Sequence, residues 1–177
     1  ENDEIHLAKN WYHYGYLEMT RGNMEKCYQF HSNAATIFQE HDENELLNWT
    51  LHQIGNALYY LNRDKEAVDT FELCLKHRIN SGSSEDEIYN VQYMIAVYST
   101  INGDYDKSRH QLNGCYKIFS KSDSEWHKKM QRLCKKNFAW LEYLSGNKKG
   151  AVNMFEELLI IESTSRFESC IHAALGR

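Results

Sequence analysis

The chain carries one short pattern four times, and this internal repeat limits the folds it can adopt. In each copy a polar turn is followed by a small residue, and the four small residues are Cys27, Ala67, Ser108 and Ala151. Successive copies are 40, 41 and 43 residues apart. In the copy at residues 54–75, a helix ends at a polar turn and a second helix places Ala67, Phe71 and Cys74 along one side. One helix pair of this kind cannot bury its own apolar side, so the pairs must stack on one another.

The composition predicts an all-α fold. Proline is absent, and only 9 of the 177 residues are glycine, so little interrupts a helix away from the turns. The predicted architecture is an α-solenoid of about four antiparallel helix pairs plus the start of a fifth. Helices are expected at about residues 1–20, 24–39, 43–61, 65–80, 85–101, 106–120, 123–144 and 149–162, with a further opening helix at 166–177.

We expect a single repeat domain over residues 1–177. Its copies are predicted at about 7–41, 42–82, 84–121 and 122–164, with a partial copy at 165–177. The first residue is Glu1 rather than Met, and the last, Arg177, falls inside an expected helix. We therefore expect the chain to be a piece of a longer protein.

Four Ser or Asp residues stand three places before a Glu at the same phase of the repeat. The pairs are Asp42 with Glu45, Ser84 with Glu87, Ser122 with Glu125 and Ser165 with Glu168. In such a capping box, each side chain accepts a hydrogen bond from the other residue's backbone amide at the start of a helix. These pairs are predicted to begin the first helix of each later copy.

Further positions are shared between the copies. They are Trp11 and Gly15 in the first copy; Leu51, Ile54, Gly55, Leu58, Ala67 and Phe71 in the second; Ile95, Ala96, Gly103, Asp104, Tyr105 and Ser108 in the third; and Phe138, Ala139, Gly146, Asn147, Ala151 and Phe155 in the fourth. This pattern resembles the tetratricopeptide repeat. The chain departs from that family because His31 replaces a usual aromatic residue and no proline ends a copy. The copies are also longer than the usual 34 or so residues, which resembles the repeats of peptide-pheromone receptors of Gram-positive bacteria and of some eukaryotic cargo adaptors.

The resemblance implies a right-handed superhelix whose first helices line a concave groove for an extended peptide or a partner helix. The residues placed in that groove are Tyr12, Tyr16, Trp49, His52, Asn56, Tyr59, Tyr93, Lys136, Trp140 and Tyr143. Rigid aromatic rings would supply contact area, and the Asn56 amide could pair with a peptide backbone. For each ring the alternative is packing between repeats, and for Asn56 it is simple solvation.

The charge pattern argues against nucleic acid as a partner. The formal net charge is -5 and the pI is near 6.0, whereas nucleic-acid-binding proteins usually carry a clustered positive excess. One local exception lies at residues 126–136, where Lys128, Arg132 and Lys135 fall on one face of the expected helix. That face could meet an acidic partner or a phosphate backbone, and a solvated surface is the alternative.

The sequence contains no recognised catalytic or metal-binding motif. The nine histidines never form a ligand spacing such as H-E-x-x-H, and neither a phosphate-binding glycine loop nor a nucleophile turn is present. The five cysteines are odd in number and lack a C-x-x-C pair, which favours small buried residues in a reducing cytoplasm. No apolar run is long enough to span a membrane, and no signal-peptide pattern appears. We therefore expect a cytoplasmic protein that is not an enzyme and needs no cofactor or metal.

The predicted function is a protein- or peptide-binding module. The alternative is a peptide-pheromone-gated regulator, of the transcription-factor or phosphatase type, whose effector domain is missing from this chain. An upstream helix-turn-helix segment in the full-length protein would favour the regulator, and its absence would favour a scaffold.

Overall fold

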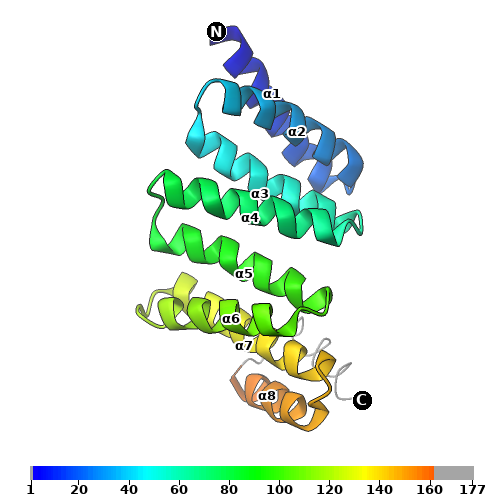
Figure 1. Cartoon of the computed structure of the whole chain (residues 1–177), viewed down its shortest axis with the longest axis vertical. Coiled ribbons are helices and arrows are strands. Elements are labelled where there is room, and N and C mark those ends of the chain that lie inside the picture. The colour runs from blue at the N-terminus through cyan, green and yellow to red at the C-terminus, as the bar shows by residue number, and fades with distance from the viewer. Residues whose placement is uncertain (1, 162–177) are drawn as a thin grey trace. The chain divides into compact units, whose positions relative to one another are not determined.

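Eight helices make up the part of the chain that the structure describes, residues 2–161 of a computed structural model (Figure 1). They are α1 (Asn2–Thr20), α2 (Met24–Glu40), α3 (Asn44–Tyr60), α4 (Asp64–Asn80), α5 (Glu85–Ile101), α6 (Tyr105–Phe119), α7 (Glu125–Leu144) and α8 (Lys148–Ile161). Each agrees to within two residues with a helix predicted from the repeat. The expected helix at 166–177 and the pair Ser165 with Glu168 lie outside the described residues.

The chain divides into two compact units, Glu1–Val91 and Gln92–Arg177, and the division falls within α5. In the first unit α1 packs against α2, α2 against α3, and α3 against α4. In the second unit α6 packs against α7, and α7 against α8. Because the connections are only a few residues long, the helices of these pairs run antiparallel and pack against each other.

Left-handed residues close the helices at the turns. Asp42 and Asn62 have φ angles of 54° and 58°, a region that Asp and Asn enter more readily than other residues with a side chain. After Asp42, the Glu43 amide donates a 2.9 Å hydrogen bond to the Phe38 carbonyl. This is the Schellman arrangement, which satisfies carbonyl groups left unpaired at the end of a helix.

Two of the predicted capping boxes are wrong. Asp42 closes α2 in the left-handed region, so it cannot also adopt the extended conformation of a cap, and Glu43 precedes α3 without a side-chain cap hydrogen bond. Ser122 lies too early, because α7 begins after Ser124. The Ser124 hydroxyl accepts a 3.2 Å hydrogen bond from the His127 amide, so it is the capping group of α7.

The pair Ser84 and Glu87 confirms the capping-box prediction at the start of α5. The Ser84 amide donates to Glu87 Oε2 at 3.1 Å, and the Glu87 amide donates to Ser84 Oγ at 3.3 Å. A cap that the sequence analysis did not predict begins α6, where Asp104 accepts from the Lys107 amide at 3.3 Å. Local side chains thus fix where both helices begin.

Two glycines allow the helices of each pair in the first unit to approach closely. A Cβ atom at Gly55 would lie 2.7 Å from the Phe71 ring, and one at Gly15 would lie 2.7 Å from His31 Nε2. His31 stands 40 residues before Phe71, is 0% exposed and has no hydrogen-bond partner at either ring nitrogen. Burial lowers the pKa of His31 to about 4. A neutral imidazole therefore fills the space of the phenyl ring in the first copy.

The core of the second unit uses alanine where the first unit uses glycine. Ala139 of α7 packs with Ala151, Phe155 and Leu158 of α8, and all four are buried. Ala139 and Phe155 occupy the repeat positions of Gly55 and Phe71. The small residue and the ring therefore pair again in the fourth copy.

Candidate functional site

The predicted groove residues of the first unit lie on the first helix of each pair. Tyr12 and Tyr16 belong to α1, and Trp49, His52, Asn56 and Tyr59 belong to α3. The Tyr16 side chain is 48% exposed and that of Trp49 is 39% exposed, whereas Tyr12 and Tyr59 are half-buried. Rings held on packed helices lose little conformational freedom when a ligand contacts them. Of the rings predicted to line the groove in the first unit, Tyr16 on α1 and Trp49 on α3 are thus the exposed ones.

His52 and Asn56 are one turn apart on α3 and contact each other, with 3.3 Å between His52 Nδ1 and Asn56 Nδ2. The His52 ring also packs edge-on against Phe71, with 5.4 Å between the ring centroids. Burial, together with the charge of Arg78, lowers the pKa of His52 to about 4. His52 is therefore neutral at pH 7 and contributes to α3–α4 packing, while Asn56 keeps part of its surface exposed.

Tyr93, predicted to line the groove from α5, is largely enclosed in the second unit. Its side chain is 8% exposed, and its hydroxyl accepts a 2.6 Å hydrogen bond from Asn137 Nδ2 of α7. Burial raises the pKa of Tyr93 above its ordinary value. The ring therefore joins α5 to α7 and offers little area to a partner.

The remaining groove residues of the second unit are Lys136, Trp140 and Tyr143 of α7, all half-buried. The Trp140 ring packs edge-on against Tyr143 at 5.8 Å and against Phe155 of α8 at 5.5 Å between centroids. The Lys148 ammonium lies 5.9 Å from the Tyr143 ring centroid. Part of each ring is thus used for α7–α8 packing and part remains accessible.

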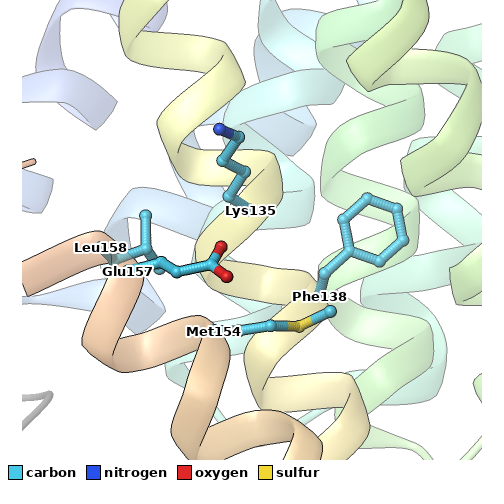
Figure 2. A pocket seen from close by; sticks show the side chains of 5 residues that line it. All are labelled: Lys135, Phe138, Met154, Glu157 and Leu158. Atoms are coloured by element: carbon cyan, nitrogen blue, oxygen red, sulfur yellow. The ribbon is translucent and has the colours of Figure 1, made fainter.

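The basic residues predicted to share one face of α7 lie around a single hollow. Lys128, Arg132 and Lys135 line a space of about 190 Å³ together with Gln131 and with Leu158 of α8. A second hollow, of about 200 Å³, is lined by Lys135, Phe138, Met154, Glu157 and Leu158. Figure 2 shows Met154 of α8 directed toward Phe138 of α7.

A third hollow extends this surface to α6. It measures about 380 Å³ and is lined by Arg109, Asn113, Tyr116, Lys135, Phe138 and Met154. The Lys135 ammonium lies 5.9 Å from the centroid of the Tyr116 ring. Lys135 lines all three hollows, and Phe138, Met154 and Leu158 each line two of them. We call the three hollows together the basic groove. Its floor is apolar, and most of the charged groups around it are cationic.

A polar pocket of about 420 Å³ lies where the first turns of α3 and α5 meet the end of α4. It is lined by Asn44, Glu45, Asn48, Trp49, Arg78, Ser81, Ser83 and Glu87, and we call it the Arg78 pocket. The Arg78 side chain is 1% exposed, and its Nη1 lies 3.5 Å from Glu87 Oε1. Its guanidinium carbon lies 5.1 Å from the Trp49 ring centroid, while Nε and Nη2 have no hydrogen-bond partner.

Comparison with known proteins identifies the fold. No family model matches the sequence, and no curated protein matches it significantly. The apo form of RapI superimposes with a TM-score of 0.76 at 18% identity, over 89% of this chain and 56% of RapI. The repeats of a putative kinesin light chain from Podosopora anserina give 0.71 at 14% identity, over 95% of this chain and 86% of that one. BtubC (BKLC) from P. vanneervenii gives 0.69 at 15% identity, over 99% and 81%.

The chain has the fold of a tetratricopeptide-repeat array. In this array α1, α3, α5 and α7 are the first helices of their pairs, and α2, α4, α6 and α8 are the second helices. The predicted groove residues all lie on first helices, whereas the basic groove also takes residues from the second helices α6 and α8. The chain spans about 56% of the length of RapI.

Arg78 is not among the residues predicted to form a site, although the sequence contains a signal for it. Phe71, Cys74 and Arg78 recur at intervals of three and four residues on α4, which is the spacing of the buried stripe. All three are buried. A charged residue on an otherwise apolar stripe is therefore the pattern that would have marked this pocket.

Within residues 2–161 of the array, no group of three or more His, Cys, Asp or Glu side chains is placed to hold a metal ion. Of the helices described, none is both long enough and apolar enough to cross a membrane. Cys27, Cys74, Cys115 and Cys134 are buried, as expected for small packing residues, and Cys170 lies outside the described part.

Proposed function

We propose that this array is a module that binds an extended peptide segment of a partner, without catalysis, in a reducing cytoplasm. The observation that carries the proposal is the exposure of Tyr16 and Trp49, 48% and 39%, on the packed first helices α1 and α3. Their rings are amphipathic and held in place, which is typical of side chains that anchor a partner. Tyr12, Tyr59 and Asn56 supply the surface beside them.

In the second unit, the proposed contact surface is on α7. Lys136, Trp140 and Tyr143 are partly accessible there, and the cation can pair with an acidic or carbonyl group of the partner. Tyr93 has a supporting role, because its hydroxyl is bonded to Asn137. His52 likewise supports α3 from within the α3–α4 interface.

The test is a titration with a peptide selected for binding to this chain from a displayed peptide library. Tyr16→Ala or Trp49→Ala should weaken binding by about 2 kcal/mol, since a few large desolvated residues usually carry most of the binding energy. Asn56→Ala should cost roughly 1 kcal/mol, for one hydrogen bond to the peptide backbone. The matched control is Leu73→Ala, which shortens an exposed apolar side chain on the second helix α4.

Helicity is measured for every variant, so that unfolding is not mistaken for lost binding. If Leu73→Ala weakens binding while Tyr16→Ala and Trp49→Ala leave it intact, the partner lies on the second helices and the assignment fails.

A second contact is proposed at the basic groove, for an acidic segment that carries an apolar side chain. Lys128, Arg132 and Lys135 surround the groove, and Phe138 and Met154 lie on its floor. This combination of charge and apolar surface favours an acidic partner over a basic one. Glu157 is the carboxylate among the lining residues of the two hollows at α8.

A peptide-pheromone-gated regulator is the second candidate function, with its effector domain outside this chain. The likeness of the fold to RapI, at a TM-score of 0.76, favours it. In that case a bound peptide should change the pitch of the array, which small-angle scattering would detect as a change in radius of gyration. A radius unchanged at saturation with the selected peptide would favour the scaffold.

A further inference from the structure

We propose that the Arg78 pocket, which shares Trp49 with the first-helix surface and lies apart from the basic groove, is a binding site for a carboxylate group. It takes the carboxylate of a small acid, or of a terminal or acidic residue of a partner. The proposal does not depend on peptide binding, because the guanidinium and the residues around it define the ligand by themselves.

The charged Arg78 guanidinium is buried and incompletely paired. An arginine side chain remains protonated in proteins, and this one is 1% exposed. Two of its three nitrogens have no hydrogen-bond partner, although a buried charge is costly unless it is paired and hydrogen-bonded. A carboxylate is the group that matches a guanidinium best, because two oxygens can accept from two nitrogens at once.

Glu87 supplies only part of this pairing, and the capping box explains why. Its Oε2 accepts from the Ser84 amide at 3.1 Å and interacts with the Ser84 hydroxyl at 3.0 Å. The other oxygen, Oε1, stays 3.5 Å from Arg78 Nη1, beyond the usual hydrogen-bond range. Ser84 thus holds Glu87 at the start of α5, where it balances the arginine charge without forming a close bidentate pair.

The other polar groups of the pocket add hydrogen-bonding capacity. Asn48 Nδ2 donates to Ser81 Oγ at 3.2 Å, and the hydroxyls of Ser81 and Ser83 are 3.3 Å apart. The hydroxyl groups can turn to donate to an anion. The first turns of α3 and α5 also contribute partial positive charge. The Trp49 ring, stacked near the guanidinium, forms an apolar wall.

Two carboxylates of the chain repel an anionic ligand. Removing one of these charges should therefore change the affinity for a carboxylate in a known direction. Glu87 lies beside Arg78, and Glu45 is an exposed residue at the rim. Removing the charge of Glu87 should therefore strengthen the binding of a carboxylate. The same change would weaken the binding of a cation to this pocket.

The experiment titrates the full chain with sodium acetate at constant ionic strength, with sodium chloride as the balancing salt. Two-dimensional NMR follows the Arg78 Nε–H and Trp49 indole N–H signals, and acetamide serves as the uncharged isostere. Acetate should shift both signals saturably, and acetamide should not. Failure of acetate to shift the Arg78 signal, or an equal response to acetamide, would overturn the carboxylate assignment.

Three variants make the result specific. Glu87→Gln should tighten acetate binding roughly fivefold, because a like charge a few ångström away is removed. Arg78→Gln should abolish the response at Trp49, whereas Arg63→Gln, which changes an arginine paired with Glu66 elsewhere in the first unit, should leave it intact. If Arg78→Gln fails to fold, Glu87→Gln still decides, since unchanged or weaker acetate binding there refutes the proposal. None of these outcomes bears on peptide binding at Tyr16, so the two proposals can fail separately.

Discussion

Replacing Gly55 with leucine should destabilise the first unit by about 2 kcal/mol. The backbone of α3 lies so close to α4 that a Cβ atom at Gly55 would be 2.7 Å from both Cε2 and Cζ of Phe71, whereas ordinary van der Waals contact begins at 3.4 Å. Phe71 is 0% exposed and also contacts the His52 ring, with centroids 5.4 Å apart. The ring therefore has little room to retreat.

The magnitude follows from two opposing effects. Forcing extra carbon atoms into a packed interface usually costs about 1 to 3 kcal/mol, and leucine adds a whole isobutyl group here, so the upper end applies. Leucine is a better helix former than glycine, which offsets about 0.8 kcal/mol. The net loss of about 2 kcal/mol corresponds to a fall in Tm of about 4 to 8 °C for a chain of this length.

The assay is thermal unfolding followed by far-ultraviolet circular dichroism. The control is Asn56→Leu, which introduces the same side chain one position along α3 at a partly exposed site and should change stability by less than about 0.5 kcal/mol. Combining Gly55→Leu with Phe71→Ala should be less destabilising than the two single changes added together, because the deleted ring makes room for the leucine. A Tm for Gly55→Leu equal to that of the wild type, or strict additivity in the double variant, would refute this account of the contact.

Three further outcomes are expected. His31→Phe should stabilise the chain at pH 7 by roughly 1 to 2 kcal/mol, because it removes a buried ring with two unpaired nitrogens and recreates the Gly–Phe pair of the second copy; a lower urea midpoint would contradict it. Burial lowers the pKa of His31 and His52 from 6.5 to about 4, so the unfolded chain binds protons more readily and stability should fall as the pH drops from 6.5 toward 4. Urea midpoints measured across that range check the slope, which His31→Phe should reduce. Changing Lys128, Arg132 and Lys135 together to Glu should abolish binding to poly-glutamate. If the wild type binds poly-glutamate with an affinity that does not fall as salt is added, the basic groove is not a site for an acidic partner.

The helices were predictable because each turn repeats the same chemistry. Gly22, Asn62, Gly103 and Gly146 all take positive φ angles, and such residues can be recognised in a sequence as helix ends. Asp42 could not be assigned in this way, because Asp serves both as a cap before a helix and as a left-handed residue after one. Only the backbone conformation distinguishes the two roles.

The candidate sites were less predictable, because rotation about a helix axis decides whether a ring is exposed. Tyr16 and Tyr93 are both aromatic residues on first helices, yet the first is exposed and the second is 8% exposed. The hydrogen bond from Asn137 to Tyr93 joins residues 44 positions apart, so no local sequence pattern predicts it. Arg78 shows the same limit, since its burial depends on α3 and α5 as well as on its own helix.

The buried thiols provide a built-in reporter of local opening. Burial raises the pKa of all four described cysteines, to about 11 for Cys27 and about 12 for Cys134, and the thiolate is the form that reacts with alkylating reagents. Modification therefore has to wait until the surrounding helices separate. Since Cys27 and Cys74 lie in the first unit and Cys115 and Cys134 in the second, a short pulse of iodoacetamide followed by mass spectrometry would measure the opening of each unit in the same sample, without any engineered label.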